Sequence, residues 1–381
     1  MNITSKLPNV GTSIFAVMSA LATEHRAINL SQGFPDFDCS ERLQGLVAAA
    51  MSEGWNQYAP MPGLLRLRER IAEKIDLLYQ KTVNPADEIT ITAGGTQAIF
   101  TAITTFIKAG DEVIVIEPAY DCYLPPIELV GGVPVIYSMQ APDYRIDWDK
   151  MAALVTPKTK MLMFNTPHNP TGTVWSAADF VALQNLVKNT NILVISDEVY
   201  EHLVYDNASH ESILSYPDLY ERSIVIYSFG KTFHTTGWKM GYCVASPSLT
   251  AEFRKVHQFN VFSVNTPIQH ALSEFLASPN EYLSLNNFYQ AKRDFLLAAT
   301  ANSKFRPLPC AGTYFQLLDY SQISDESDVV FARRLTTEIG VAVIPVSAFY
   351  SDGYDGKVVR LCFAKKESTL LQAAELLNTV C

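Results

Sequence analysis

The sequence predicts an α/β protein: a mostly parallel, seven-stranded sheet in a large domain, plus a smaller α+β domain. Three observations support this prediction. Short apolar runs rich in β-branched residues alternate with longer helical stretches from about residue 88. These runs are apolar throughout, as is typical of strands covered on both faces by helices. In the last hundred residues the pattern changes to long helices separated by a few strands.

Seven strand candidates define the large sheet. They are EITIT (88–92), EVIVIE (112–117), VPVIY (133–137), KMLMFN (160–165), NILVIS (191–196), SIVIYSF (223–229) and MGYCVA (240–245). Helices are predicted between them, including one that ends at Gly110 and one over 176–189. Because the last two runs leave no room for a helical crossover, we expect MGYCVA to be antiparallel to its neighbour.

The C-terminal part has its own order of elements. A long helix is predicted at about 281–303, and further helices at 329–340 and 366–380. Strand-like runs occupy AGTYFQLLDY (311–320), VAVIPVSAFY (341–350) and VVRLCFA (358–364). We therefore expect three regions: an N-terminal arm with part of the small domain (1–43), the large domain (44–280) and the C-terminal small domain (281–381).

Composition excludes several classes of protein. The 381 residues are 48% hydrophobic and 18% charged, which is enough for a large core and excludes a disordered or fibrous chain. A net charge of −10 argues against a nucleic-acid or anionic-membrane partner. Six scattered cysteines without C-x-x-C, no apolar run of ~18 residues and no secretory leader predict a cytoplasmic protein. No G-x-G-x-x-G follows a strand, so a nicotinamide dehydrogenase is not expected.

The strongest motif, Ser228-Phe229-Gly230-Lys231-Thr232, follows an apolar strand. A lysine in this position forms Schiff bases with carbonyl cofactors if burial or a nearby cation lowers its pKa. Ser228 and Lys239 flank it, and they offer a hydroxyl donor and a cation to a phosphate. The alternative is an ordinary surface lysine.

Two further motifs follow neighbouring strands. Asp197 ends NILVISD, where a buried carboxylate would keep a pyridine nitrogen protonated, and the Tyr200 hydroxyl could bond a phenolic oxygen. Asn169 lies in the rigid loop NTPHNPTG (165–172), which would hold its amide in a fixed position. A solvated acidic loop and a structural turn are the alternatives.

Three other segments complete the candidate site. Gly95, Thr96 and Gln97 open a helix after a strand, where free N–H groups can cradle a phosphate. Tyr120 follows the second strand and could stack on a flat ring or pack in the core. Arg360 lies inside an apolar run, where its charge needs either a carboxylate ligand or an internal ion pair.

Together these motifs resemble the class I/II aminotransferases of pyridoxal-phosphate (PLP) fold type I, over essentially the whole chain. The resemblance is strongest to the branch that holds bacterial methionine aminotransferases and kynurenine/glutamine transaminases. The matching stretches are SQGFPDF (31–37), NQYAPMPGLLRLRE (56–69), AGGTQA (93–98), EPAYDCY (117–123), NTPHNPTG (165–172), SDEVYEH (196–202), SFGKTFHTTGWKMGY (228–242), VHQFNVFSVNTPIQ (256–269), AGTYF (311–315), IPVSAFY (344–350) and VRLCFAKK (359–366).

The resemblance implies catalytic roles for Lys231, Asp197 and Tyr200. Lys231 would be the Schiff-base lysine and proton shuttle, and Asp197 the partner of the pyridine nitrogen. Asn169 and Tyr200 would bind the phenolic oxygen, and Tyr120 would stack on the ring. The phosphate would be held by Gly95, Thr96, Gln97, Ser228 and Lys239, although many class I members carry Arg in place of this last lysine.

The resemblance also implies how substrates bind. Arg360 would clamp the substrate α-carboxylate, helped by Asn169 and the backbone near Gly33. Tyr58 would reach the phosphate of a neighbouring subunit, so a homodimer with shared active sites is expected. The substrates would be an amino acid and a 2-oxo acid, which react by a ping-pong mechanism.

Phe15 and Phe262 fall in segments that line the side-chain pocket in this branch, and no second arginine occupies a motif position. We therefore expect neutral, apolar or aromatic donors: methionine first, then Phe, Tyr, Gln or kynurenine. Plain core packing is the alternative for both phenylalanines. A PLP-dependent cysteine-conjugate β-lyase and a non-catalytic binding or regulatory protein are the alternative functions.

Overall fold

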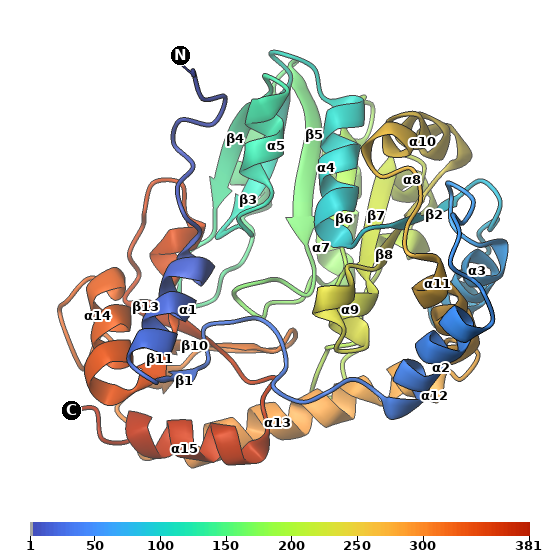
Figure 1. Cartoon of the computed structure of the whole chain (residues 1–381). Coiled ribbons are helices and arrows are strands. Elements are labelled where there is room, and N and C mark those ends of the chain that lie inside the picture. Colours follow the sequence, from blue (N-terminus) through green and yellow to red (C-terminus); the bar gives the residue numbers. More distant parts are fainter. Residues whose placement is uncertain (1–2) are drawn as a thin grey trace.

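The computed structural model describes residues 3–381 and, within them, forms one seven-stranded sheet in the order β2-β8-β7-β6-β5-β3-β4 (Figure 1). Strands β3 to β7 are parallel to one another, whereas β8 is antiparallel to both β7 and β2. The expected α/β fold, with a mostly parallel sheet in which β8 is antiparallel to its neighbour β7, is thus confirmed. The strands are β2 (Ile89–Thr92), β3 (Glu112–Glu117), β4 (Val133–Ser138), β5 (Thr159–Asn165), β6 (Leu193–Asp197), β7 (Ser223–Ser228) and β8 (Gly241–Ala245).

The sheet separates two apolar clusters, which explains why its strands lack polar alternation. In β3, Val113 and Val115 belong to one cluster and Ile114 and Ile116 to the other. Helices cover both faces: α4 (Gly95–Phe106), α5 (Leu124–Leu129) and α10 (Pro247–Asn260) on one side, and α7 (Ala177–Val187) on the other. Side chains on both faces of a strand are therefore removed from water.

Helix α4 is shorter than the sequence predicts. It ends at Phe106, because Ile107 is extended and places its buried side chain in the apolar cluster beside α5. Gly110 lies beyond the helix in a turn, where its N–H donates to the carbonyl of Gly131. Burial of a β-branched side chain here outweighs continuation of the helix.

A second sheet of four short strands, order β12-β13-β10-β9, lies beside the large one within residues 3–381. Its strands are β9 (Arg306–Pro307), β10 (Phe315–Asp319), β12 (Ile344–Pro345) and β13 (Val358–Cys362). The long predicted helix at 281–303 is divided into α12 (Asn280–Leu283) and α13 (Leu285–Ala299). The predicted helix at 329–340 is α14 (Asp328–Arg334) followed by a π-helical turn to Ile339, and α13 packs against α15 (Glu367–Leu377) (Figure 1).

The N-terminal segment joins the C-terminal part of the chain. Strand β1 (Ile28–Asn29) pairs in parallel with β11 (Val341–Ala342). The boundaries 1–43, 44–280 and 281–381 stay a prediction, and residues 1 and 2 of the first region lie outside the described residues. The remaining helices are α1 (Ile14–Glu24), α2 (Glu41–Ser52), α3 (Leu65–Tyr79), α6 (Trp148–Ala153), α8 (Pro217–Tyr220), α9 (Phe229–Thr232) and α11 (Thr266–Phe275). From residue 3 to the C-terminus, no helix has the length and apolar character that crossing a bilayer requires.

Candidate active site

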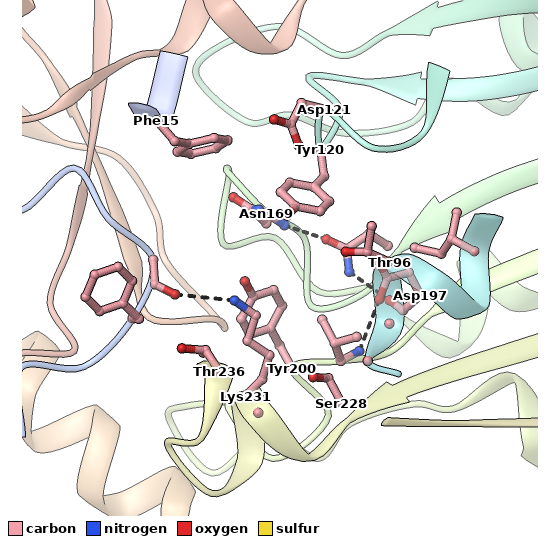
Figure 2. A pocket seen from close by; sticks show the side chains of 18 of the residues that line it. Phe15, Thr96, Tyr120, Asp121, Asn169, Asp197, Tyr200, Ser228, Lys231 and Thr236 are labelled. Atoms are coloured by element: carbon pink, nitrogen blue, oxygen red, sulfur yellow. Dashed lines mark hydrogen bonds between the residues drawn. The ribbon is translucent and has the colours of Figure 1, made fainter. Parts of the chain in front are cut away.

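A cavity of about 380 Å³ opens at the carboxyl ends of β5, β6 and β7, the edge at which ligands bind in parallel α/β sheets. Its size is in the ordinary range for small-molecule sites. Figure 2 shows that side chains from the strand ends and Phe15 from the N-terminal segment point into it. Phe315 and Arg360 of the small sheet also line it. The predicted residues that line it are Phe15, Gly33, Gly95, Thr96, Tyr120, Asn169, Asp197, Tyr200, Ser228, Lys231, Lys239 and Arg360.

Lys231 lies in the short helix α9, directly after β7. Its Nζ donates to the carbonyl oxygen of Gly33 at 3.3 Å and to the hydroxyl of Tyr314 at 3.1 Å. Burial lowers the pKa of Lys231 to about 8, and the charge of Arg360 acts in the same direction. An amine with this pKa is partly neutral near pH 7 and can act as a nucleophile or base.

Asp197 is the last residue of β6 and is buried. Its Oδ2 accepts a hydrogen bond of 2.6 Å from the Tyr123 hydroxyl, and its Oδ1 accepts from the N–H of Val199. Burial raises the pKa of Asp197 to about 6, against the effect of these hydrogen bonds. Tyr123 was not identified as a site residue from the sequence. Only its place in the matching stretch EPAYDCY pointed to it.

Asn165 joins the two loops that follow β5 and β6. Its Nδ2 donates to the carbonyl of Asp197 and its Oδ1 accepts from the N–H of Asn169, both at 2.7 Å. Asn165 was not assigned a role from the sequence. These bonds tie the backbone of Asn169 to the backbone of Asp197.

Arg360 lies in β13 with only 1% of its surface exposed. Its Nη1 donates to Oδ1 of Asn169 and its Nη2 to the carbonyl of Ser31, both at 2.9 Å, and its Cζ lies 3.9 Å from the ring centroid of Phe315. Within residues 3–381 no carboxylate comes within ion-pair distance of it, so the internal ion pair is not formed. Burial lowers its pKa to about 10. A buried, unpaired guanidinium is the expected receptor for a ligand carboxylate.

The start of α4 offers free backbone donors. Gly94 caps the helix with φ +81°, and no described residue accepts the N–H groups of Gly95, Thr96 and Gln97. Ser228 and Lys239 also line the cavity, and Cε of Lys239 lies 3.7 Å from the position that a Cβ on Gly94 would take. The Gln97 side chain does not line the cavity, because it donates to Thr101 Oγ1 at 2.6 Å and accepts from the N–H of Ala93. Gln97 can therefore contribute only its backbone.

Aromatic rings form the other walls. Tyr120 is half-buried, and its ring centroid lies 6.4 Å from that of Phe15. The Phe15 ring also lies 5.2 Å from the Cζ of Arg360, so it sits beside the guanidinium. The Tyr200 ring contacts Tyr314 edge to face at 5.3 Å, and Lys231 Nζ lies 5.7 Å from its centroid.

The structure places Tyr58 and Phe262 away from the cavity. Their rings pack edge to face at 5.2 Å, and 80% and 53% of their surfaces are exposed. The expectation that Phe262 lines the pocket does not hold within one chain. It follows α10 with φ +68°, and its ring packs on Tyr58 instead.

The donor set fits pyridoxal phosphate. Free N–H groups at a helix start, with Lys239 beside them, suit a dianionic phosphate. A buried amine of lowered pKa suits an aldehyde, and a buried carboxylate suits a protonated ring nitrogen. In the described part of the chain no group of three His, Cys, Asp or Glu side chains could hold a metal ion.

Comparison with known proteins agrees with this chemistry. The family model for aminotransferase class I and II matches residues 25–377. The chain is 53% identical to a methionine aminotransferase of Escherichia coli (strain K12), over 98% of this chain and 97% of that protein. It is 34% identical to a kynurenine–oxoglutarate transaminase of Dictyostelium discoideum, over 95% and 93% of the two chains.

Solved structures show the same fold. The structure of YbdL from Escherichia coli, described as having a methionine aminotransferase function, superposes with a TM-score of 0.98 at 52% identity and covers 99% of each chain. The superposition extends over both sheets. This chain belongs to the class I and II aminotransferase family.

Proposed function

We propose that this transaminase transfers the amino group of a neutral, apolar or aromatic amino acid to a 2-oxo acid, with methionine as the favoured donor and pyridoxal phosphate as cofactor. One observation carries the proposal: the half-buried Lys231 amine and the buried, unpaired Arg360 guanidinium share one cavity. The first binds a carbonyl and the second binds a carboxylate, which are the groups that cofactor and substrate present. The names of the two relatives support the choice of substrates.

Each part of the cofactor has a candidate partner. Ser228, Lys239 and the N–H groups of residues 95–97 would bind the phosphate, and Asp197 the ring nitrogen. Asn169 and Tyr200 would bind the phenolic oxygen, and Tyr120 would lie against the ring. When bound, the cofactor supplies an aldehyde that condenses with amines and a ring that accepts electrons from the substrate Cα.

The chain itself supplies binding and proton transfer. Arg360 orients the substrate through its α-carboxylate, with Asn169 already hydrogen-bonded to the same guanidinium. Lys231 Nζ, once neutral, removes the proton from the substrate Cα and holds it for return. Its lowered pKa keeps a useful fraction of the amine neutral near pH 7.

The walls of the cavity favour neutral side chains. Phe15 and Tyr120 line it, and Arg360 is the one arginine on its surface among residues 3–381. Asp121 also lines the cavity, and no described residue donates a hydrogen bond to its carboxylate. With Lys231 and Lys239 engaged by the cofactor and Arg360 by the α-carboxylate, a second carboxylate on a substrate would find no further cation among the lining residues and would be repelled by Asp121.

A donor panel tests the proposal. We expect purified holoenzyme to use methionine, phenylalanine and glutamine with a 2-oxo monoacid, and to use aspartate at least tenfold less efficiently in kcat/KM. Lys231→Ala provides the inactive control. Faster turnover of aspartate would contradict the specificity. Pyruvate release from a cysteine conjugate without an oxo acid would instead indicate a β-lyase.

We also propose that the active unit is a homodimer, because the exposed pair Tyr58 and Phe262 would reach the neighbouring subunit's cavity. Sedimentation analysis tests this assembly. The six cysteines are all unpaired, which supports a cytoplasmic location. The regions 1–43, 44–280 and 281–381 are our proposed domain division.

A further inference from the structure

Tyr314 contacts the reactive amine, although no motif singled it out. It directly precedes β10, and its side chain is fully buried. Its hydroxyl donates to the carbonyl oxygen of Gly33 at 2.6 Å and accepts from Lys231 Nζ at 3.1 Å. Lys231 Nζ also donates to the same carbonyl at 3.3 Å. The three groups form a closed triangle of hydrogen bonds.

The direction of each hydrogen bond follows from the number of protons. The Tyr314 hydroxyl carries one proton, and the short bond to Gly33 uses it, so toward Nζ the hydroxyl is an acceptor. The carbonyl of Gly33 is also only an acceptor. A neutral Lys231 amine has two N–H groups. The two acceptors are only 2.6 Å apart and subtend about 50° at Nζ, so the N–H groups reach them through bent hydrogen bonds on one side of the nitrogen.

With both N–H groups on the side of Tyr314 and Gly33, the lone pair of the neutral amine points away from these two residues. In a tetrahedral amine it lies opposite the side occupied by the two N–H bonds and the Cε. Within residues 3–381, the only hydrogen-bond partners of Nζ are Tyr314 and Gly33, so nothing else competes for it. Figure 2 shows Lys231 held toward the N-terminal segment, with the cavity open on its other side.

We propose that Tyr314, together with the Gly33 carbonyl, orients the lone pair of Lys231 into the cavity for proton transfer. Tyr314 is then a positioning residue, and this role rests on the proposed transaminase function. The hydroxyl cannot at the same time protonate Nζ, because its proton is held by Gly33.

Packing keeps the triangle in place. The Tyr314 ring contacts Tyr200 at 5.3 Å, Phe315 at 4.9 Å and Tyr289 at 5.7 Å. A Cβ on residue 33 would lie 2.8 Å from Cζ of Phe315, so only glycine allows the carbonyl to approach this closely. Packing therefore fixes the positions of the Tyr314 hydroxyl and the Gly33 carbonyl, the two acceptors of the Lys231 amine.

The test compares Tyr314→Phe with Tyr289→Phe. Both remove one hydroxyl from a buried ring in the same cluster, but the Tyr289 hydroxyl has no hydrogen-bond partner among the described residues. In cofactor-free protein, the pH dependence of Lys231 acylation, read by mass spectrometry of its peptide, reports its pKa. In Tyr314→Phe the ammonium form loses an acceptor, so we expect about tenfold more neutral amine below pH 7. Tyr289→Phe should match the wild type.

A second measurement uses the holoenzyme. Tyr314→Phe should lower kcat for methionine about tenfold with little change in KM, and raise the kinetic isotope effect with Cα-deuterated methionine, because proton transfer becomes slower. Equal pKa and equal isotope effects in the two variants would overturn the proposal. If the wild type failed to transaminate but the acylation shift appeared, the proposed function would fail while the hydrogen-bonded triangle stood.

Discussion

Two buried carboxylates four residues apart behave in opposite ways. Asp197 faces the cavity, and burial raises its pKa to about 6. Glu201 faces the other side of the same segment, and its pKa is lowered to about 2. Burial alone would raise both values, so the difference comes from their partners.

The partners of Glu201 form a cluster of paired groups, which we call the Lys74 cluster: Lys74, Tyr79, Glu201 and Tyr242. Glu201 is ion-paired with Lys74 and accepts from the Tyr79 hydroxyl at 2.6 Å, while Lys74 Nζ donates to Tyr242 at 2.9 Å. Coulombic attraction to Lys74 therefore outweighs burial. Asp197 has no such cation in hydrogen-bond contact.

The Lys74 cluster supports the structure, whereas the charges in the cavity are available to ligands. In the Lys74 cluster the charges are satisfied within the chain, which anchors the segment that carries Asp197 and Tyr200. Among residues 3–381 no charged partner is ion-paired with Asp197, Lys231 or Arg360 in the cavity, and burial shifts the pKa of each toward the neutral form. Burial also lowers the pKa of Lys74, but the attraction of Glu201 opposes that effect. Unpaired buried charge costs stability and is retained where a ligand completes it.

The largest expected effect comes from breaking the Lys74 cluster. Lys74→Met leaves Glu201 buried without its cation, so the free energy of unfolding should fall by about 3–5 kcal/mol. Chemical denaturation at fixed protein concentration measures it. The double variant Lys74→Met/Glu201→Gln should recover part of the loss, because it removes the unpaired charge.

Lys255→Met is the matched control. This lysine pairs with Glu252 at 2.6 Å on an exposed helix face, and such pairs contribute about 0–1 kcal/mol. If Lys74→Met were no more destabilising than Lys255→Met, the buried pair would have no special role and the comparison would fail.

The next largest expected effect is a gain in the free energy of unfolding, on Asp197→Asn. With the pKa of Asp197 near 6 in the folded state and 3.8 as the model-compound value, ionisation favours unfolding as pH rises between these values. Asp197→Asn removes this term. The cofactor-free variant should be more stable than the wild type by up to about 3 kcal/mol above pH 6, and the difference should shrink toward pH 4.

We expect bound cofactor to stabilise the wild type more than Asp197→Asn. Added pyridoxal phosphate should raise the unfolding midpoint of the wild type more than that of Asp197→Asn, because only the carboxylate favours a protonated ring nitrogen. A variant that is less stable than the wild type at pH 8 without cofactor would show that Asp197 is already satisfied by Tyr123 and Val199.

These two clusters also show what the sequence could predict. Asp197 ends β6, and Lys231 and Asn169 lie three and four residues beyond the ends of β7 and β5, so strand patterning alone brings them to one sheet edge. Lys74 and Glu201 are 127 residues apart, and no local pattern pairs them. Gly33 and Tyr314 are 281 residues apart, and their contact depends on how the N-terminal segment meets the small sheet.

Phe262 shows that a match to a family motif does not predict where a side chain points. Its segment matched the family, and the resemblance implied that this segment lines the side-chain pocket without saying of which subunit. Its ring packs on Tyr58 outside the cavity of its own chain. Gln97 likewise lay in the right motif, but its side chain satisfies its own helix. Motifs thus predicted the backbone position of these residues and not the direction of their side chains.

The smallest expected effect is a gain in cofactor affinity on Lys239→Arg. This substitution would add one paired contact to a cavity whose charges are otherwise unpaired. Lys239 supplies a point charge near the start of α4, whereas arginine offers a planar fork that matches two phosphate oxygens. Lys239→Arg should tighten cofactor binding by up to about tenfold, measured by fluorescence titration of the cofactor-free protein. Lys239 has φ +55°, and lysine and arginine carry the same Cβ, so we expect the same backbone strain in both proteins. Because lysine and arginine carry the same charge and the added bond would lie at the phosphate, kcat at saturating cofactor should stay the same. A large fall in kcat would mean that Lys239 also acts on the reacting atoms.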